Sequence, residues 1–224
     1  MGRADTQVSL EDMLGHIKQM VEATDLPVNA DFESGFAKDA ASVSANVARC
    51  LETGVAALSI EDSISAESSQ LYPQDIAVER LKAARAAIDA HGNGALLVGR
   101  CEAYLTPHTA PFEETLTRLK AYSQAGADVL YAPGVRKPQE IAALVQAVSP
   151  KPLNIVVGWE SDLNVRDYAA LGVRRISVGG SLARAAWAGF AQAAAHLAAG
   201  SFAGFAGPRL DLDGFFAKDR TEYP

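Results

Sequence analysis

The sequence predicts an α/β fold, a TIM-type (β/α)8 barrel of which about six of the eight strands lie in this chain. Short apolar runs rich in β-branched residues alternate with longer segments of helical period, as they do in repeated βα units around a parallel sheet. Each run is apolar apart from its carboxyl end, which is typical of strands buried on both faces. The 224 residues, of which 49% are hydrophobic, provide the core of one large domain.

Six strands are expected in order along the chain, with a helix ahead of the first one. A closed barrel of this kind has eight strands and about 250 residues, so about two βα units at the front are expected to be missing. The expected strands are PVNADFE (27–33), VAALSIED (55–62), ALLVGRCE (95–102), DVLYAPG (128–134), PLNIVVG (152–158) and RRISVGG (174–180).

Residues that favour helix ends separate these runs. Ser9, with Asp12 three residues later, opens the first helix, and Asp39 can cap the helix that follows the first strand. Gly54 stands where a left-handed residue would end that second helix. Pro138 suits the first turn of a helix after the fourth strand. These end signals support the strand boundaries as well.

The carboxyl-terminal part is expected to hold a long helix and an irregular tail. Ser181 precedes the Ala-rich stretch 182–199. This helix carries Trp187 and is apolar on more than one face, which indicates burial against another surface or against the outer wall of its own barrel. Residues 201–224 are less regular. Because no linker or repeat divides the chain, we expect one domain over 1–224.

The composition argues against several classes of function. The formal net charge is -7 and the pI is about 5.1, whereas nucleic-acid binding needs clustered Lys and Arg. The chain has no apolar run of about 18 residues that could span a bilayer, and its first residues lack the pattern of a secretory signal. The two cysteines, Cys50 and Cys101, are far apart and are expected to be free thiols. We therefore expect a cytoplasmic protein with no nucleic-acid or membrane partner.

Acidic side chains gather at the ends of the first two expected strands. Asp31 and Glu33 close the first strand, where alternation places them on one side, and Glu61 and Asp62 close the second. Because the carboxyl ends of barrel strands meet at one face, these carboxylates would repel one another unless they are protonated or neutralised by a cation. Mg²⁺ is the expected ion because it prefers oxygen ligands, and Mn²⁺ is possible. Alternatively, single acids, Asp62 above all, cap helices or form salt bridges.

Arg100 ends the third expected strand. A guanidinium there can bind a carboxylate or phosphonate through two parallel hydrogen bonds. It can also serve as the counter-ion of Glu61 or Glu102, and the two roles are compatible. Cys101 points to the opposite face by alternation and is expected to pack in the interior. His108, in the following loop, is a candidate general acid, although a lone loop histidine is usually a surface residue.

Four strings occur in the order and spacing of a known superfamily. LPVNADFESGF, LSIEDS, LVGRCEAYL and AGADVLYAPGV resemble the successive strand ends of the isocitrate lyase and phosphoenolpyruvate mutase superfamily, with its methylisocitrate lyase-like and oxaloacetate decarboxylase-like members. The resemblance implies that Asp31 binds Mg²⁺ directly and that Glu33 and Glu61 act largely through bound water. It also implies that Arg100 contacts the substrate. The start GRADTQVSLEDML is similar to the loop after the second strand of the family, where Asp5 matches another acid of the metal site.

The reaction that this resemblance implies is carbon–carbon bond cleavage in a small 2-oxo or 2-hydroxy carboxylate, through an enolate and with Mg²⁺. Glu61 and Arg100 would be its catalytic residues. The stretch 63–70 lacks the Cys, Lys and His of true isocitrate lyases and also the Lys and Asn of phosphonate mutases, so both of those reactions are disfavoured. Ser68 and Ser69 in this stretch could orient the substrate or could simply be solvated.

The resemblance also bears on assembly and on the start of the chain. Family members exchange their C-terminal helix between subunits, so a homodimer or homotetramer with such an exchange is expected. They carry further residues upstream, including a Ser and Gly pair that holds a substrate carboxylate. Met1 is therefore expected to be an internal methionine, or the chain to be a truncated relative. A truncated, catalytically silent oligomer subunit is one alternative function.

Other reaction classes fit the sequence less well. A Schiff-base aldolase needs a lysine at the carboxyl end of a strand, whereas Lys151 precedes its strand and Lys137 lies several residues past another. Gly179, Gly180 and Ser181 before a helix suggest a phosphosugar-binding barrel, although they could form only a tight turn, and such barrels need no carboxylate cluster. A phosphonate-type mutase or a hydrolase of the same superfamily is the other alternative.

Overall fold

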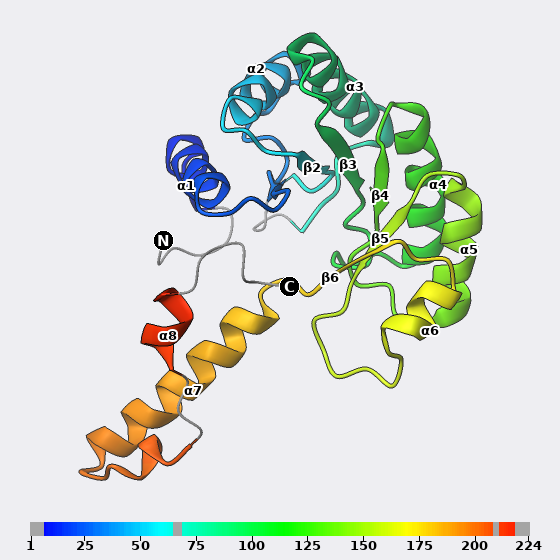
Figure 1. Ribbon diagram of the computed structural model, residues 1–224. Coiled ribbons are helices and arrows are strands. Elements are labelled where there is room, and N and C mark those ends of the chain that lie inside the picture. Colours follow the sequence, from blue (N-terminus) through cyan, green and yellow to red (C-terminus); the bar gives the residue numbers. More distant parts are fainter. Residues whose placement is uncertain (1–6, 65–68, 208–210, 218–224) are drawn as a thin grey trace. The chain divides into compact units, whose positions relative to one another are not determined.

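The computed structural model describes residues 7–64, 69–207 and 211–217. Six strands form one parallel sheet, a half-barrel in which each strand pairs with the next along the chain (Figure 1). This arrangement confirms the six expected strands and the α/β class. The strands are β1 (Asn29–Asp31), β2 (Ala57–Glu61), β3 (Leu96–Arg100), β4 (Val129–Tyr131), β5 (Leu153–Val156) and β6 (Arg175–Ser177).

Helices alternate with these strands, and those that connect them lie along the outer side of the curved sheet (Figure 1). The first helix precedes β1, as expected. These helices are α1 (Leu10–Glu22), α2 (Ala40–Leu51), α3 (Gln74–His91), α4 (Pro111–Gln124), α5 (Pro138–Val148) and α6 (Val165–Ala170).

The helix ends follow the expected residues. The side chains of Ser9 and Asp39 each accept a hydrogen bond from a backbone amide in the first turn of α1 and α2. Gly54, just after α2, has a φ of +89°, and Pro138 is the first residue of α5. One expectation is wrong by a residue: the long C-terminal helix begins at Ser181 itself, with Gly180 in the capping position.

The core lies between the sheet and its outer helices. Leu58 and Ile60 of β2 and Leu97 of β3 are buried, as are Val43 and Val47 of α2. Because side chains alternate along a strand, the other set of strand residues faces the inner side of the half-barrel. That inner set includes the charged residues at the strand ends.

The chain divides into two compact units. The first comprises 1–156 with 161–177 and holds all six strands. The second comprises 157–160 with 178–224 and holds α7 (Ser181–Ala198), the short 3-10 helix η1 (Ala203–Phe205) and α8 (Leu212–Ala217). The expectation of a single domain stays a prediction.

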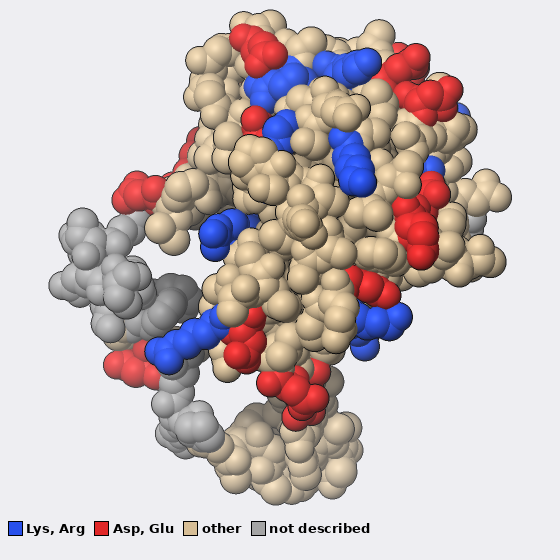
Figure 2. Space-filling view, turned by 90° about the vertical axis from the view of Figure 1, so that its right-hand side faces the viewer, with Lys and Arg blue, Asp and Glu red and all other residues tan. Residues whose placement is uncertain are grey.

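The surface carries charges of both signs. Figure 2 shows Lys and Arg side chains interspersed with Asp and Glu on one face. In the part of the chain that the structure describes, no helix is long and apolar enough to cross a membrane.

Candidate active site

The carboxyl ends of β1, β2 and β3 bring together three of the expected site residues. Asp31 is the last residue of β1, Glu61 of β2 and Arg100 of β3. Glu61 lies opposite Arg100 in the register of the sheet, and Asp31 lies opposite Ser59. Because the three strands are parallel and adjacent, their ends reach the same edge of the half-barrel.

Arg100 is the centre of this group. Its Nη1 lies 2.9 Å from Oδ2 of Asp31, and its Nε lies 3.4 Å from Oε2 of Glu61. The same Nε donates a hydrogen bond to Oε1 of Glu102. The guanidinium also lies over the ring of Tyr131, 5.2 Å from the ring centroid. The sequence-based interpretation of Arg100 as a counter-ion of Glu61 and Glu102 is confirmed, and Asp31 is a third partner.

The charges of this group do not balance. Three carboxylates face one guanidinium, whose side chain is only 15% exposed. Burial raises the pKa of Glu61 to about 7, although the charge of Arg100 opposes the rise. Burial also raises the pKa of Glu102. Burial disfavours the charged form of Arg100, but the surrounding carboxylates outweigh it and raise the pKa of Arg100.

Glu33 does not belong to the strand that was expected to carry it. β1 ends at Asp31, and Glu33 has a φ of +46° in the following turn. The strand alternation that placed Asp31 and Glu33 on one side is therefore wrong as an argument for Glu33. The carbonyl of Glu33 accepts a hydrogen bond from the amide of Glu61, at 3.0 Å, so the turn is tied to the end of β2.

The group fits a hard divalent cation in its donor chemistry and in its charge. Its donors are carboxylate oxygens, which Mg²⁺ prefers, and one positive charge is too few for three acids. The side chain of Asp31 is 67% exposed, which leaves its oxygens accessible. Within the described residues, however, no three His, Cys, Asp or Glu side chains gather around a common centre; Arg100 lies among the carboxylates instead. Asp5 and Ser68 fall outside the described residues.

The comparisons with known proteins show the family of the chain. Residues 1–198 match the phosphoenolpyruvate phosphomutase family. The chain belongs to this family. Oxaloacetate decarboxylase from Rhodopseudomonas palustris (strain BisB18) is 29% identical over 174 residues, which cover 76% of this chain and 58% of the relative. 2-Methylisocitrate lyase from Salmonella typhimurium (strain LT2) is 32% identical over 136 residues, which cover 58% of this chain and 45% of the relative. The chain thus spans about half the length of the curated relatives that it matches.

Two solved structures share this fold with the chain. A candidate lyase/mutase from Burkholderia cenocepacia J2315 matches with a TM-score of 0.89 and 40% identity, over 97% of this chain and 79% of that one. Oxaloacetate acetylhydrolase in complex with oxalate matches with a TM-score of 0.80 and 25% identity, over 88% of this chain and 69% of that one.

In this phosphomutase-family chain, Asp62 has the structural role expected of it. Its carboxylate is buried and accepts hydrogen bonds from the Tyr122 hydroxyl at 2.5 Å and from the Glu102 amide at 2.8 Å. Arg118 of α4 lies 3.3 Å from the same carboxylate. This network lies behind the strand ends and fixes the backbone at Glu102, which in turn contacts Arg100.

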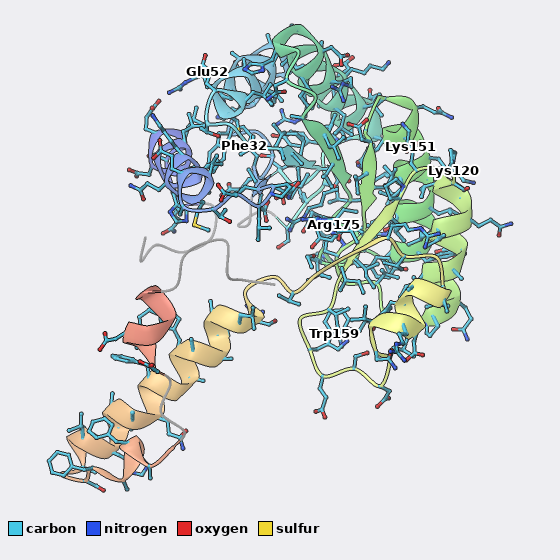
Figure 3. All side chains as sticks on the ribbon, viewed as in Figure 1. Phe32, Glu52, Lys120, Lys151, Trp159 and Arg175 are labelled. Carbon is cyan, nitrogen blue, oxygen red and sulfur yellow. The ribbon has the colours of Figure 1, made fainter. Side chains whose placement is uncertain are left out.

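Other residues considered from the sequence form none of the ion pairs of Arg100. Cys101 is fully buried, and burial raises the pKa of its thiol, which suits the expected packing role. His108 and Ser69 are exposed. Lys151 (Figure 3) donates hydrogen bonds to the backbone carbonyls of Ser123 and Ala127, which is a structural role.

The sequence did not reveal three further residues of the group: Tyr131, which contacts Arg100, and two serines, which contact the acids. Tyr131 ends β4, so the rule that polar residues at strand ends mark the site would have found it. The hydroxyl of Ser63 donates a hydrogen bond to Glu61, and that of Ser59 lies 3.4 Å from Asp31. Serines of this kind carry no distinguishing signal in a single sequence.

Proposed function

We propose that this chain acts in a Mg²⁺-dependent lyase that cleaves a carbon–carbon bond in a small 2-oxo or 2-hydroxy carboxylate through an enolate. Mn²⁺ is an acceptable substitute ion. The observation that carries the proposal is the group of three carboxylates around the buried Arg100 at the ends of adjacent parallel strands. Such a group provides both a cation for a substrate carboxylate and excess negative charge for a metal ion.

The roles of the residues follow from their chemistry. Arg100 binds a substrate carboxylate through its guanidinium. Asp31 would hold the divalent ion directly, and Glu33 and Glu61 would hold it through water. The bound ion would supply positive charge to the enolate oxygen that develops as the bond breaks. Without the ion, burial raises the pKa of Glu61 to about 7, and Glu61 would be the residue that holds or releases a proton in the reaction. Ser69, with Ser68, would orient the substrate.

The electron balance of the reaction explains why positive charge is needed beside the substrate. When the carbon–carbon bond of a 2-oxo acid breaks in a decarboxylation, its electron pair passes to the carbon next to the carbonyl and is shared with the carbonyl oxygen, while the departing carboxylate becomes carbon dioxide. In a 2-hydroxy acid, a base takes the hydroxyl proton, the carbon that bore the hydroxyl leaves as a carbonyl compound, and the electron pair passes to a carbon next to a carboxylate. A proton then returns to that carbon. Relatives named for oxaloacetate decarboxylation, oxaloacetate acetyl hydrolysis and 2-methylisocitrate cleavage favour a substrate of this class. A phosphonate-type mutase or a hydrolase is the alternative within the superfamily.

Calorimetric titration with Mg²⁺ and oxalate, a mimic of the pyruvate enolate, tests the proposal. We expect oxalate to bind only when Mg²⁺ is present, and Asp31→Asn to abolish the binding while the protein stays folded. Asp25→Asn, which changes an exposed acid before β1, should bind as the unaltered protein does. A folded protein that binds no oxalate with Mg²⁺ would instead support a catalytically silent subunit.

We further propose that the protein forms a homodimer or homotetramer in which the C-terminal helix packs on a second copy. In α7, all of whose residues are described, no side chain is buried within the chain. Trp187 and Phe190 are 67% and 64% exposed and contact each other edge to face. Apolar side chains exposed together in this way favour a protein partner.

A further inference from the structure

The loop after β1 has an unusual backbone. Three of its residues, Glu33, Gly35 and Phe36, have φ values of +46°, +84° and +53°. Glycine adopts such values freely, but a side chain makes them unfavourable. Two residues of this kind so close together persist only when neighbouring groups determine the loop conformation strongly.

Two side chains from other helices hold this loop. Arg80 of α3 donates hydrogen bonds to the carbonyls of Ala37 at 2.7 Å and Lys38 at 2.9 Å, and also to that of Ser34. Asn46 of α2 donates from Nδ2 to the two carbonyls between them, those of Gly35 at 3.0 Å and Phe36 at 3.1 Å. Each of the five successive carbonyls 34–38 thus accepts a hydrogen bond from a side chain outside the loop.

Arg80 also contacts the loop after β2. Its guanidinium lies over the ring of Tyr72, 4.3 Å from the centroid. Tyr72 ends that loop, and its amide donates a hydrogen bond to the carbonyl of Asp62 at 2.8 Å. Arg80 is 1% exposed. The N–H groups of its buried guanidinium bind the backbone of the loop after β1, and the face of the guanidinium stacks on Tyr72, at the end of the loop after β2.

We propose that Arg80 is a positioning residue of the candidate active site, which fixes the backbone of 33–38 and thereby the direction of Glu33. Glu33 is the acid next to the held carbonyls, and its own carbonyl bonds the amide of Glu61. The conformation of this loop would therefore set the position of Glu33 and, through that backbone bond, of Glu61. The inference rests on the proposed function, because Glu33 and Glu61 are acids that would hold the ion through water.

The planar, forked guanidinium of arginine allows Arg80 to make all of these contacts at once. Three carbonyls accept from one guanidinium while its face stacks on Tyr72. Lysine keeps the charge but presents a compact ammonium that cannot reproduce the fork or the stacking. Arg80→Lys therefore keeps the positive charge and removes the hydrogen-bonding and stacking geometry of the guanidinium. Asn46→Ala removes two of the five hydrogen bonds without altering Arg80, and it serves as a second variant if Arg80→Lys does not fold.

Arg85 offers a matched control on the same helix. Its side chain is 21% exposed and pairs with Asp89 and with Asp128, which precedes β4 at the other end of the sheet. Arg85→Lys makes the same chemical change in α3 without touching either loop.

The experiment combines hydrogen exchange of 33–38, followed by mass spectrometry, with Mg²⁺–oxalate affinity measured on variants whose thermal unfolding shows them to be folded. In Arg80→Lys and Asn46→Ala we expect faster exchange of this segment and a loss of affinity of about 10–100-fold. Arg85→Lys should show neither change.

The inference would be overturned if residues 33–38 of Arg80→Lys exchange as slowly as those of the unaltered protein. It would also be overturned if these residues exchange faster but the affinity for Mg²⁺ and oxalate is unchanged. If the unaltered protein binds no oxalate, the proposed function fails by itself. Exchange of 33–38 then still decides whether Arg80 fixes the loop.

Discussion

At the scale of single residues, Glu61 carries the clearest electrostatic consequence. Its ordinary pKa is 4.5, and burial raises it to about 7 in the folded protein. Between these two pH values the folded state binds more protons at Glu61 than the unfolded state does. The free energy of unfolding must therefore fall as the pH rises through this window, because ionisation of a buried carboxyl costs more than ionisation in water.

We predict this fall for the metal-free protein, with Glu61→Gln as the comparison. Glu61 alone should lower the free energy of unfolding by on the order of 3 kcal/mol between about pH 4.5 and pH 8. Urea unfolding at several pH values measures it. The free energy of unfolding of the variant should depend less steeply on pH, since glutamine does not ionise. The carboxyls of Glu102 and Asp62, whose pKa values burial also raises, are present in both proteins. Equal slopes in the two proteins would refute the assignment.

At the scale of elements, the close packing of β3 on the segment from α4 to β4 supports the site. Gly99 precedes Arg100, and a Cβ at Gly99 would lie 3.0 Å from Cβ of Ala127 and 3.2 Å from Cβ of Tyr122. Tyr122 in turn hydrogen-bonds Asp62. The missing side chain of Gly99 thus allows the strand that carries Arg100 to approach the network that holds Glu102.

Gly99→Ala should accordingly lower the free energy of unfolding by about 1–3 kcal/mol, the usual cost of overpacking a core. Gly15→Ala provides a contrast of opposite sign. Gly15 is exposed in α1 with no atom within 4 Å of an added Cβ, so alanine should stabilise the helix by up to about 1 kcal/mol. Chemical unfolding of both variants measures the difference. A Gly99→Ala protein as stable as the unaltered one would contradict the close packing.

At the scale of the whole molecule, the proposed assembly rests on the exposed aromatic residues of α7. We predict that light scattering coupled to size exclusion finds an oligomer, and that the double variant Trp187→Ser with Phe190→Ser shifts it toward monomer, because it removes the exposed apolar contact. Gln192→Ala, elsewhere on the same helix, should keep the oligomer. An unaltered protein that runs as a monomer would rule out the proposed assembly.

Six strands, their parallel arrangement and the convergence of Asp31, Glu61 and Arg100 could be predicted from the amino-acid sequence alone. These follow from local patterns: the hydrophobic period, the capping residues at Ser9 and Asp39, and the rule that parallel strands end at one edge. The other features of the site could be found only in the folded chain. β1 ends at Asp31, so the position of Glu33 is set by the turn that follows and not by the strand. Arg100 serves three acids at once, and Arg80 holds carbonyls 42 to 46 residues away in the sequence. Such contacts join segments distant along the chain, and a polar residue in a helix gives no local sign of the loop that it will hold.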